Sequence, residues 1–306
     1  MTDSLNGLVE EVDFSGIGAP HAPRGEVQQS AAEWVRTADG ALLSAQAFVP
    51  RERPTAAVVL AGATAVPSRY YKAFATALAR EGFAVMTFDY RGVGRSREAH
   101  PAPDMRGWFE DINAVVSLVA ERYAGLPVLY VGHSFGGHAL GVSRAVATHV
   151  RAAVSVASMS GWVGHWPMPA RLKIEALWRV AVPFFAGTLG YVPGWAGLQE
   201  DLPGGVARDW AGWCLTPGYF RGALEAETAQ FDTLAVPILF QNYSDDAYAP
   251  AAAVEEFVGW FRSATITREV LEPKRHGLSS IGHFGFFREK NAALWGPVIA
   301  WLKAQR

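Results

Sequence analysis

The chain has 306 residues, half of them hydrophobic, and a formal net charge of −2 at pH 7. This length fits either one large α/β domain with an insertion or two smaller domains. The near balance of charges, without a basic stripe, argues against a nucleic-acid partner. The single cysteine, Cys214, rules out an internal disulfide and fits a reducing compartment, so we expect a cytoplasmic protein without a metal-thiolate site.

The first third of the chain is predicted to form an arm followed by strands and helices. Residues 1–30 are polar and interrupted by glycine and proline, so we expect a loose N-terminal arm without a signal peptide. Asp39-Gly40 separates two strand-like runs, which predicts a β-hairpin over 34–49. The remaining patterns predict strands at 56–60 and 83–88 and helices near 70–80 and 106–124.

Residues 132–136, Gly-His-Ser-Phe-Gly, are the most informative segment. A strand-like run at 126–131 precedes them and a helical run at 137–147 follows. A serine on a sharp strand-to-helix turn projects its hydroxyl away from the backbone, beside the N–H groups of the helix N-terminus. Gly132 and Gly136 fit such a turn because it leaves no room for a Cβ atom. The segment therefore predicts that Ser134 is a nucleophile.

The strand and helix pattern of the second half is interrupted once. A strand is expected at 150–156, and the segment 158–231 is rich in Trp, Gly and Pro. The alternation then resumes with strands at 236–240 and 265–271 and helices at 251–262 and 288–303. Alternating strands and helices predict a mostly parallel sheet covered on both faces. We therefore expect a core of 31–157 and 232–306, with a mainly helical cap at 158–231.

The uncharged run 180–198 has almost the length of a membrane span. It contains two prolines and four glycines, which suit a broken and packed segment better than a straight helix. We therefore expect no membrane span.

A serine nucleophile requires a histidine base and an acid that orients it. Asp245 and Asp246 both follow the strand at 236–240, where an acid is expected. We favour Asp246 as this acid, and one of the two could instead cap the next helix. His283 is preferred as the base because it follows the last strand between small and aromatic residues. The order serine, aspartate, histidine is the one that this architecture uses. His138 and His165 are weaker candidates, whereas His133 is expected to pack beside the turn and His276, next to Lys274 and Arg275, to lie on the surface.

The remaining site residues are predicted from loops and from the cap. The N–H groups of Phe135 and Ala63 are expected to form the oxyanion hole, with Thr64 as the alternative to Ala63. The loop 89–96 contains Gly-x-Gly but lacks a phosphate-binding pattern, so we expect a turn near the pocket floor. Most cap aromatics are expected to form the cap's own core. Those expected to line an apolar acyl pocket are Trp162, Trp166, Phe184 and Tyr191.

Taken together, these segments resemble the α/β-hydrolase superfamily. The resemblance rests on 58–63, 89–96, 132–137 and 282–285, in that order. Many relatives carry histidine where this chain has Ala61. The resemblance implies the α/β-hydrolase fold, a Ser/Asp/His triad, no cofactor, and a cap inserted between two core strands.

These features predict a serine hydrolase that cleaves an ester, thioester or related acyl bond of a small-to-medium apolar molecule. An acyltransferase, a cyclase or a peptidase would use the same acyl-enzyme, and a non-catalytic ligand-binding protein is a further alternative. The expected partner is a small-molecule acyl substrate, and a homodimer is among the assemblies that the sequence permits.

Overall fold

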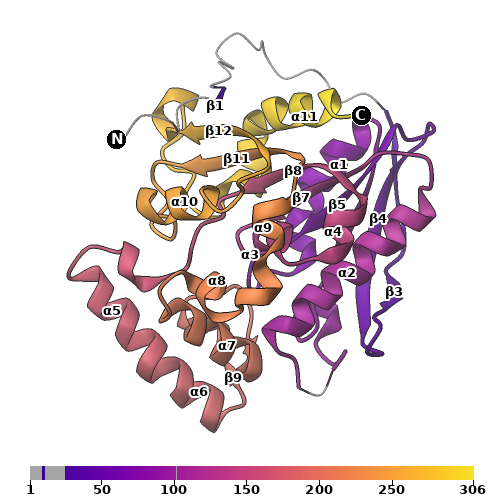
Figure 1. The fold of residues 1–306 in the computed structure, drawn as a ribbon. Coiled ribbons are helices and arrows are strands. Elements are labelled where there is room, and N and C mark those ends of the chain that lie inside the picture. Colours follow the sequence, from indigo (N-terminus) through magenta and orange to yellow (C-terminus); the bar gives the residue numbers. More distant parts are fainter. Residues whose placement is uncertain (1–8, 11–24, 101) are drawn as a thin grey trace.

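The computed structural model describes residues 9–10, 25–100 and 102–306, and a single large sheet forms its centre (Figure 1). The strands follow the spatial order β1-β12-β11-β8-β7-β5-β6-β4-β2, with β3 also paired to β4. The strands from β1 to β6 in this order are parallel, whereas β4 is antiparallel to all its neighbours. The mostly parallel sheet expected from the sequence is therefore confirmed. The strands are β1 Val9–Glu10, β2 Val27–Gln29, β3 Glu33–Arg36, β4 Leu42–Pro50, β5 Ala56–Ala61, β6 Phe83–Phe88, β7 Val128–His133, β8 Val150–Val156, β11 Pro237–Tyr243 and β12 Thr265–Leu271.

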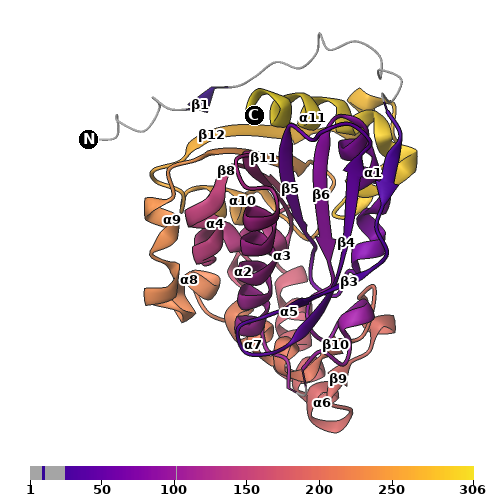
Figure 2. The ribbon, with the colours of Figure 1, turned by 90° about the vertical axis from the view of Figure 1, so that its right-hand side faces the viewer.

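Helices cover both faces of this sheet (Figures 1 and 2). One face carries α1 and α11, and the other carries α2, α4 and α10. Successive side chains of a strand point to opposite faces. In β5, Val59 therefore joins one core cluster while Val58 and Leu60 join the other. The helices are α1 Lys72–Arg80, α2 Met105–Arg122, α4 Arg144–His149, α10 Ala251–Val258 and α11 Trp295–Ala304.

The N-terminal region confirms one prediction and corrects another. The predicted hairpin is formed by β3 and β4, with Arg36 opposite Leu42 and a positive φ of 92° at Gly40. The predicted arm lies mostly outside the described residues. Where it is described, Val27–Gln29 forms β2 and pairs with the edge of β4, so a loose arm is wrong for these residues. The backbone groups of the β4 edge, which need partners, account for this pairing.

The helix expected after Ser134 is broken into pieces. It consists of α3 (Phe135–His138), a 3-10 turn (Ala139–Gly141) and α4. A Cβ atom on Gly141 would lie 2.1 Å from the ring of Phe231, so this stretch passes directly against a distant aromatic side chain. The Ser143 hydroxyl then accepts from Val146 N–H at 3.2 Å and caps a new helix.

The segment between β8 and β11 is a helical excursion from the sheet, seen as a separate group of helices in Figure 1. Since β8 and β11 are neighbours in the sheet, the chain leaves and returns at adjacent strands. The cap boundaries at 158 and 231 remain predictions. No helix in the described part of the chain has the length and apolar character that crossing a membrane requires. The elements are α5 Ala170–Ala176, α6 Val182–Thr188, β9 Tyr191–Val192, β10 Leu202–Pro203, α7 Gly204–Cys214, α8 Tyr219–Ala223 and α9 Gln230–Thr233.

Candidate active site

Ser134 lies on a strained turn between β7 and α3. Its backbone angles are φ 51° and ψ −111°, which a residue with a Cβ atom rarely adopts. Two hydrogen bonds hold the turn: Ser134 N–H donates to Val156 O at 2.8 Å, and Ser158 Oγ donates to Ser134 O at 2.9 Å. The hydroxyl is therefore presented at the end of β7 by a backbone that is fixed on both sides.

The two glycines of this turn meet the requirement that the sequence suggested. A Cβ atom on Gly132 would lie 2.5 Å from the carbonyl carbon of Gly136. A Cβ atom on Gly136 would lie 2.3 Å from Ala61 O at the end of β5. Either substitution would push backbone against backbone, which no side-chain rotation can relieve.

Asp246 and His283 come together on two loops that follow β11 and β12. Asp246 Oδ2 lies 2.7 Å from His283 Nδ1, and both side chains are buried. Asp246 Oδ1 also accepts from Tyr248 N–H at 2.8 Å, which fixes the rotation of the carboxylate. No hydrogen bond joins Ser134 Oγ to His283 among the described residues. Such contacts are often long in enzymes without a substrate and tighten when one binds.

The neighbouring carboxylate, Asp245, has a different set of hydrogen-bond partners. It accepts from the Ser280 hydroxyl at 2.7 Å, from Ile281 N–H at 2.9 Å and from Gly282 N–H at 3.0 Å. Burial raises the pKa of Asp245, but these three hydrogen bonds outweigh it and the pKa lies below its ordinary value. Asp245 therefore fastens the loop that carries His283 and does not cap the helix at 251.

A chain of hydrogen bonds links the loop after β5 to the backbone of His283. Ala63 N–H donates to Tyr71 Oη at 2.8 Å, Tyr71 Oη lies 2.9 Å from His133 Nδ1, and His133 Nε2 lies 2.9 Å from His283 O. Burial, followed by the proximity of His283, holds the pKa of His133 well below its ordinary value, so the ring is neutral. A carbonyl can only accept, so Nε2 carries the proton. Nδ1 therefore accepts from the Tyr71 hydroxyl.

This series of hydrogen bonds corrects the sequence-based choice of Ala63 as an oxyanion donor. The Ala63 N–H is already used by Tyr71, and Ala63 is buried. Thr64, the alternative considered from the sequence, lines the cavity in front of Ser134 instead. The Tyr71 contact comes from a residue eight positions further along the chain, and nothing in the local pattern of residues indicates it.

An apolar cavity of about 380 Å³ lies between Ser134 and the helical segment 158–231. Most of its lining side chains are aliphatic or aromatic; they include Phe135, Met159, Trp166, Ile174, Trp178, Val182, Trp210, Tyr219 and Tyr248. Of the four aromatics predicted to line it, only Trp166 does so. Trp162 packs against His165 with ring centroids 5.1 Å apart, while Phe184 and Tyr191 are 60% and 39% exposed on the outside. The pocket prediction is wrong for these three residues: Phe184 on α6 and Tyr191 on β9 are exposed on the outside, and Trp162 packs on His165.

His138 is a polar residue among the lining groups of this cavity. Its Nε2 lies 2.8 Å from Met159 O, and its Nδ1 has no hydrogen-bond partner in the described structure. Burial lowers the pKa of His138 to about 4, so the ring is neutral near pH 7. The cavity is therefore lined by side chains that carry no charge at this pH.

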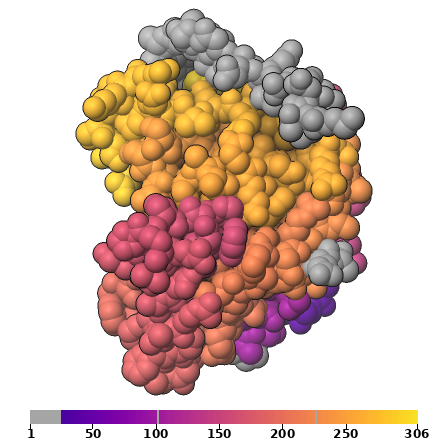
Figure 3. Space-filling view, turned by 60° about the vertical axis from the view of Figure 1, so that its left-hand side comes forward, coloured from indigo at the N-terminus to yellow at the C-terminus, as the bar shows by residue number. Residues whose placement is uncertain are grey.

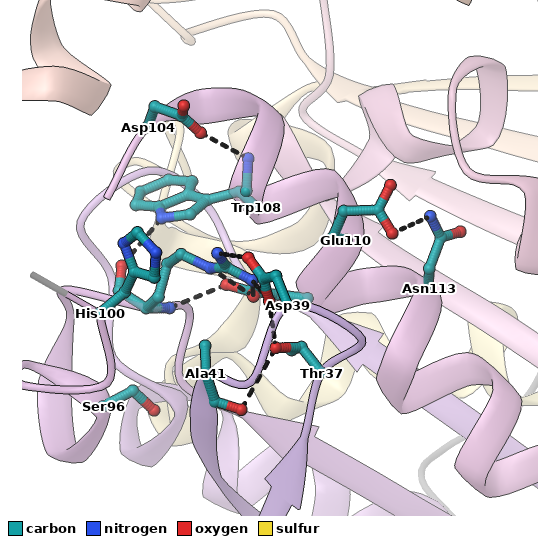
Figure 4. A network of polar contacts seen from close by, with 12 residues as sticks. Thr37, Asp39, Ala41, Ser96, His100, Asp104, Trp108, Glu110 and Asn113 are labelled. Atoms are coloured by element: carbon teal, nitrogen blue, oxygen red, sulfur yellow. Dashed lines mark hydrogen bonds and ion pairs between the residues drawn. The ribbon is translucent and has the colours of Figure 1, made fainter. Parts of the chain in front are cut away.

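A second cavity, of about 830 Å³, lies beside α2 and is lined mostly by charged and polar side chains. Figure 4 shows polar contacts among residues around it. Its buried Arg91 forms ion pairs with Asp39 and Asp111, and Trp108 Nε1–H donates to Arg91 O at 2.9 Å. Arg91 of the loop 89–96 thus contributes to this second cavity, while Tyr90 of the same loop packs behind the Ser134 cavity, with its ring centroid 5.7 Å from that of Phe135. Both carboxylates bind the guanidinium group of Arg91. Residues 25–100 and 102–306 hold no cluster of His, Cys, Asp and Glu suited to a metal ion.

Comparisons with known proteins agree with this fold. Residues 52–199 match the family model Hydrolase_4, described as serine aminopeptidase, S33. Among solved structures, a soluble variant of monoglyceride lipase from Saccharomyces cerevisiae has a TM-score of 0.65 at 16% identity, covering 94% of this chain and 99% of that one. Est1E from Butyrivibrio proteoclasticus with bound ferulic acid has a TM-score of 0.59 at 17% identity, covering 90% and 99%.

Brefeldin A esterase, described as a bacterial homologue of human hormone sensitive lipase, has a TM-score of 0.58 at 16% identity, covering 95% of this chain and 78% of that one. No curated protein matches the sequence. At these identities the solved structures show a common fold, and the family model adds a sequence match around Ser134. Together, the fold and these matches show that the chain is an enzyme of the α/β-hydrolase superfamily.

Proposed function

We propose that the protein is a serine hydrolase that cleaves an ester, thioester or related acyl bond. The observation that carries the proposal is the buried Asp246–His283 pair, 2.7 Å apart, at the same edge of the sheet as the strained turn of Ser134. A serine hydroxyl needs a base held by an acid, and these loops supply both groups. The esterases and the lipase of similar fold support the choice of an ester bond.

In the proposed reaction, Ser134 Oγ attacks the carbonyl carbon while His283 Nε2 takes its proton. Asp246 keeps the other ring nitrogen protonated and stabilises the imidazolium that forms. His283 then returns the proton to the leaving group as the bond breaks, which leaves an acyl-Ser134 enzyme. A water molecule, deprotonated by His283, attacks this ester and releases the acid.

The oxyanion of each tetrahedral intermediate needs two N–H donors. Phe135 N–H stands at the start of α3, directly after Ser134, and we assign it as the first donor. We assign Thr64 as the second, because Thr64 lines the same cavity and its N–H has no partner among the described residues, whereas Ala63 N–H is taken by Tyr71.

The cavity indicates the substrate class. Its volume of about 380 Å³ and its uncharged lining suit an apolar acyl or alcohol group of small to medium size. A charged group would lose its hydration there without gaining a partner of opposite charge. We therefore propose a small uncharged ester as the substrate. The cytoplasmic location, which the single Cys214 suggests, remains part of this proposal.

A peptidase is the second candidate, because the matched family model is described as a serine aminopeptidase. It would use the same acyl-enzyme, with His283 protonating the leaving amine. An amino-terminal substrate also requires a carboxylate or carbonyl groups for its ammonium. The cavity lining contains no acidic side chain, which favours the ester.

A series of p-nitrophenyl esters with acyl chains of 2 to 12 carbons, with amino-acid p-nitroanilides in parallel, tests the proposal. We expect kcat/KM to rise with chain length and then fall once the cavity is full, with little activity on the anilides. Ser134→Ala should lower kcat by about a millionfold, to the background rate. Preferential cleavage of the anilides would favour the peptidase, and full activity in Ser134→Ala would contradict the mechanism.

A further inference from the structure

The large apolar side chains that are exposed on the described surface are concentrated in one segment of the chain. Only a few lie elsewhere, among them Trp34 on β3 and Val270 on β12. Scattered exposed apolar residues are normal, but a contiguous group marks a surface that binds something. The members of the group are Met168, Leu172, Leu177, Val180, Phe184, Leu189, Tyr191 and Trp195.

Half of this group, Leu172, Leu177, Val180 and Phe184, lies on one helical rod. The rod consists of α5, the π-helical turn Leu177–Ala181 and α6, which follow one another without a break. Figure 1 shows it as the outermost element at the lower left, and in Figure 3 it forms the lower left of the surface. No residue of α5 or of the π-helical turn is buried. Val180 and Phe184 are 66% and 60% exposed.

The inner side of the same rod lines the cavity in front of Ser134. Ile174, Trp178 and Val182 contribute to that lining, between residues that face outward. One helix, about 10 Å in diameter, thus separates the cavity from the exposed apolar residues. An apolar molecule held at the outer side would be within one helix diameter of the proposed acyl pocket.

The charges on the rod are mainly positive. Lys173 and Arg179 are exposed on it, while its single acidic residue, Glu175, is paired with Arg171 at 2.9 Å. Two copies of the chain meeting through this surface in a symmetric dimer would bring these cations toward one another. A surface with negative headgroups around an apolar interior would instead satisfy both the cations and the apolar side chains.

We propose that this surface, the α5–α6 face (Leu172, Lys173, Arg179, Val180 and Phe184), docks on the surface of anionic lipid assemblies. The rod would lie in the plane of the interface with its apolar side chains among the acyl chains. The uncharged run 180–198, whose length suggested a span, is thus explained as an interfacial segment broken by prolines and glycines. Delivery of an apolar ester from the lipid to Ser134 is the consequence, and that part rests on the proposed function.

The test measures flotation of the full chain with vesicles of phosphatidylcholine, with and without 30% phosphatidylserine. We expect binding that is stronger with phosphatidylserine and weaker at high salt. The double variant Val180→Ser/Phe184→Ser should reduce binding at least tenfold. The double variant Lys173→Gln/Arg179→Gln should remove the preference for phosphatidylserine, at about fivefold for each cation. Val270→Ser, an equally exposed site on β12, is the control and should bind as the unchanged protein does.

Two further readouts separate this proposal from the proposed function. Flotation of Ser134→Ala should be unchanged, because docking does not need catalysis. Both double variants should hydrolyse a soluble short-chain ester normally. Failure of the unchanged protein to bind either vesicle would overturn the docking proposal. So would a concentration-dependent dimer, measured by light scattering, that Val180→Ser/Phe184→Ser dissociates. Vesicle binding without ester hydrolysis would instead reject the proposed function and leave docking intact.

Discussion

Replacing Tyr71 with phenylalanine would remove one oxygen atom from the middle of the buried chain of hydrogen bonds. In the structure this oxygen accepts from Ala63 N–H at 2.8 Å and donates to His133 Nδ1 at 2.9 Å. Both partners are at most 2% exposed, so they have no contact with solvent that could replace the hydroxyl. The aromatic ring itself keeps its edge-to-face contact with Phe287, so the substitution leaves no cavity of note.

The expected effect follows from the two groups left unpaired. A buried polar group without a partner costs about 1–3 kcal/mol, so two such groups should lower the free energy of unfolding by about 2–6 kcal/mol. Since this series of hydrogen bonds ends on the backbone carbonyl of His283, we also expect a lower kcat with little change in KM. Urea unfolding at pH 7.5, followed by tryptophan fluorescence, measures the stability, and the slope with urea should be unchanged.

Tyr70→Phe is the matched control for this measurement. Tyr70 donates a single hydrogen bond to Phe284 O at 2.6 Å, and its side chain is only half-buried. Its loss should cost about 1 kcal/mol or less. If Tyr71→Phe proves no less stable than Tyr70→Phe, then the hydroxyl of Tyr71 does not satisfy two buried groups. The proposed series of hydrogen bonds from Ala63 to His283 would then be wrong.

Three further predictions concern the loops and the turn around the site. Asp245→Asn should lower kcat severalfold with KM nearly unchanged, because the loop carrying His283 loses its charged acceptor; steady-state kinetics measures this, and an unaltered kcat would contradict it. Since burial lowers the pKa of His138 to about 4, the unfolded chain binds more protons below pH 6.5, so the free energy of unfolding should fall between pH 6.5 and 4. Urea unfolding of His138→Gln should show a smaller fall over that range, and an equal fall would assign it to other groups. Gly136→Ala should abolish activity, whereas Gly212→Ala, whose Cβ atom meets no atom within 4 Å, should keep it; equal activities would show that the turn tolerates a Cβ atom.

The core of the fold could be predicted because its signals are local. Runs of apolar residues mark β5, β6 and β8 almost to the residue, since a strand buried on both faces needs no polar side chains. The turn at Ser134 could be predicted because the glycines required by its close approaches stand next to it in the sequence. The Asp246–His283 contact could be anticipated because loops at the ends of parallel strands meet at one edge of the sheet.

The errors concern contacts between distant parts of the chain. The helix after Ser134 breaks where the ring of Phe231, ninety residues further on, lies against Gly141. The N–H of Ala63 donates to Tyr71, a tyrosine of the following helical turn. Phe184 and Tyr191 are aromatic like pocket residues, but the directions in which α6 and β9 face are set by their packing on α7. None of these contacts has a signature in the local pattern of residues.

The most direct test of the central claim is the site of covalent labelling by a fluorophosphonate. The reagent phosphonylates a serine only where a base activates the hydroxyl, so it reports on the nucleophile without knowledge of the substrate. Intact mass and peptide mapping should show one adduct, on Ser134, with labelling slowed at least a hundredfold in His283→Ala. An adduct on another serine, or no adduct on the folded protein, would contradict the assignment of Ser134, Asp246 and His283 as the catalytic residues.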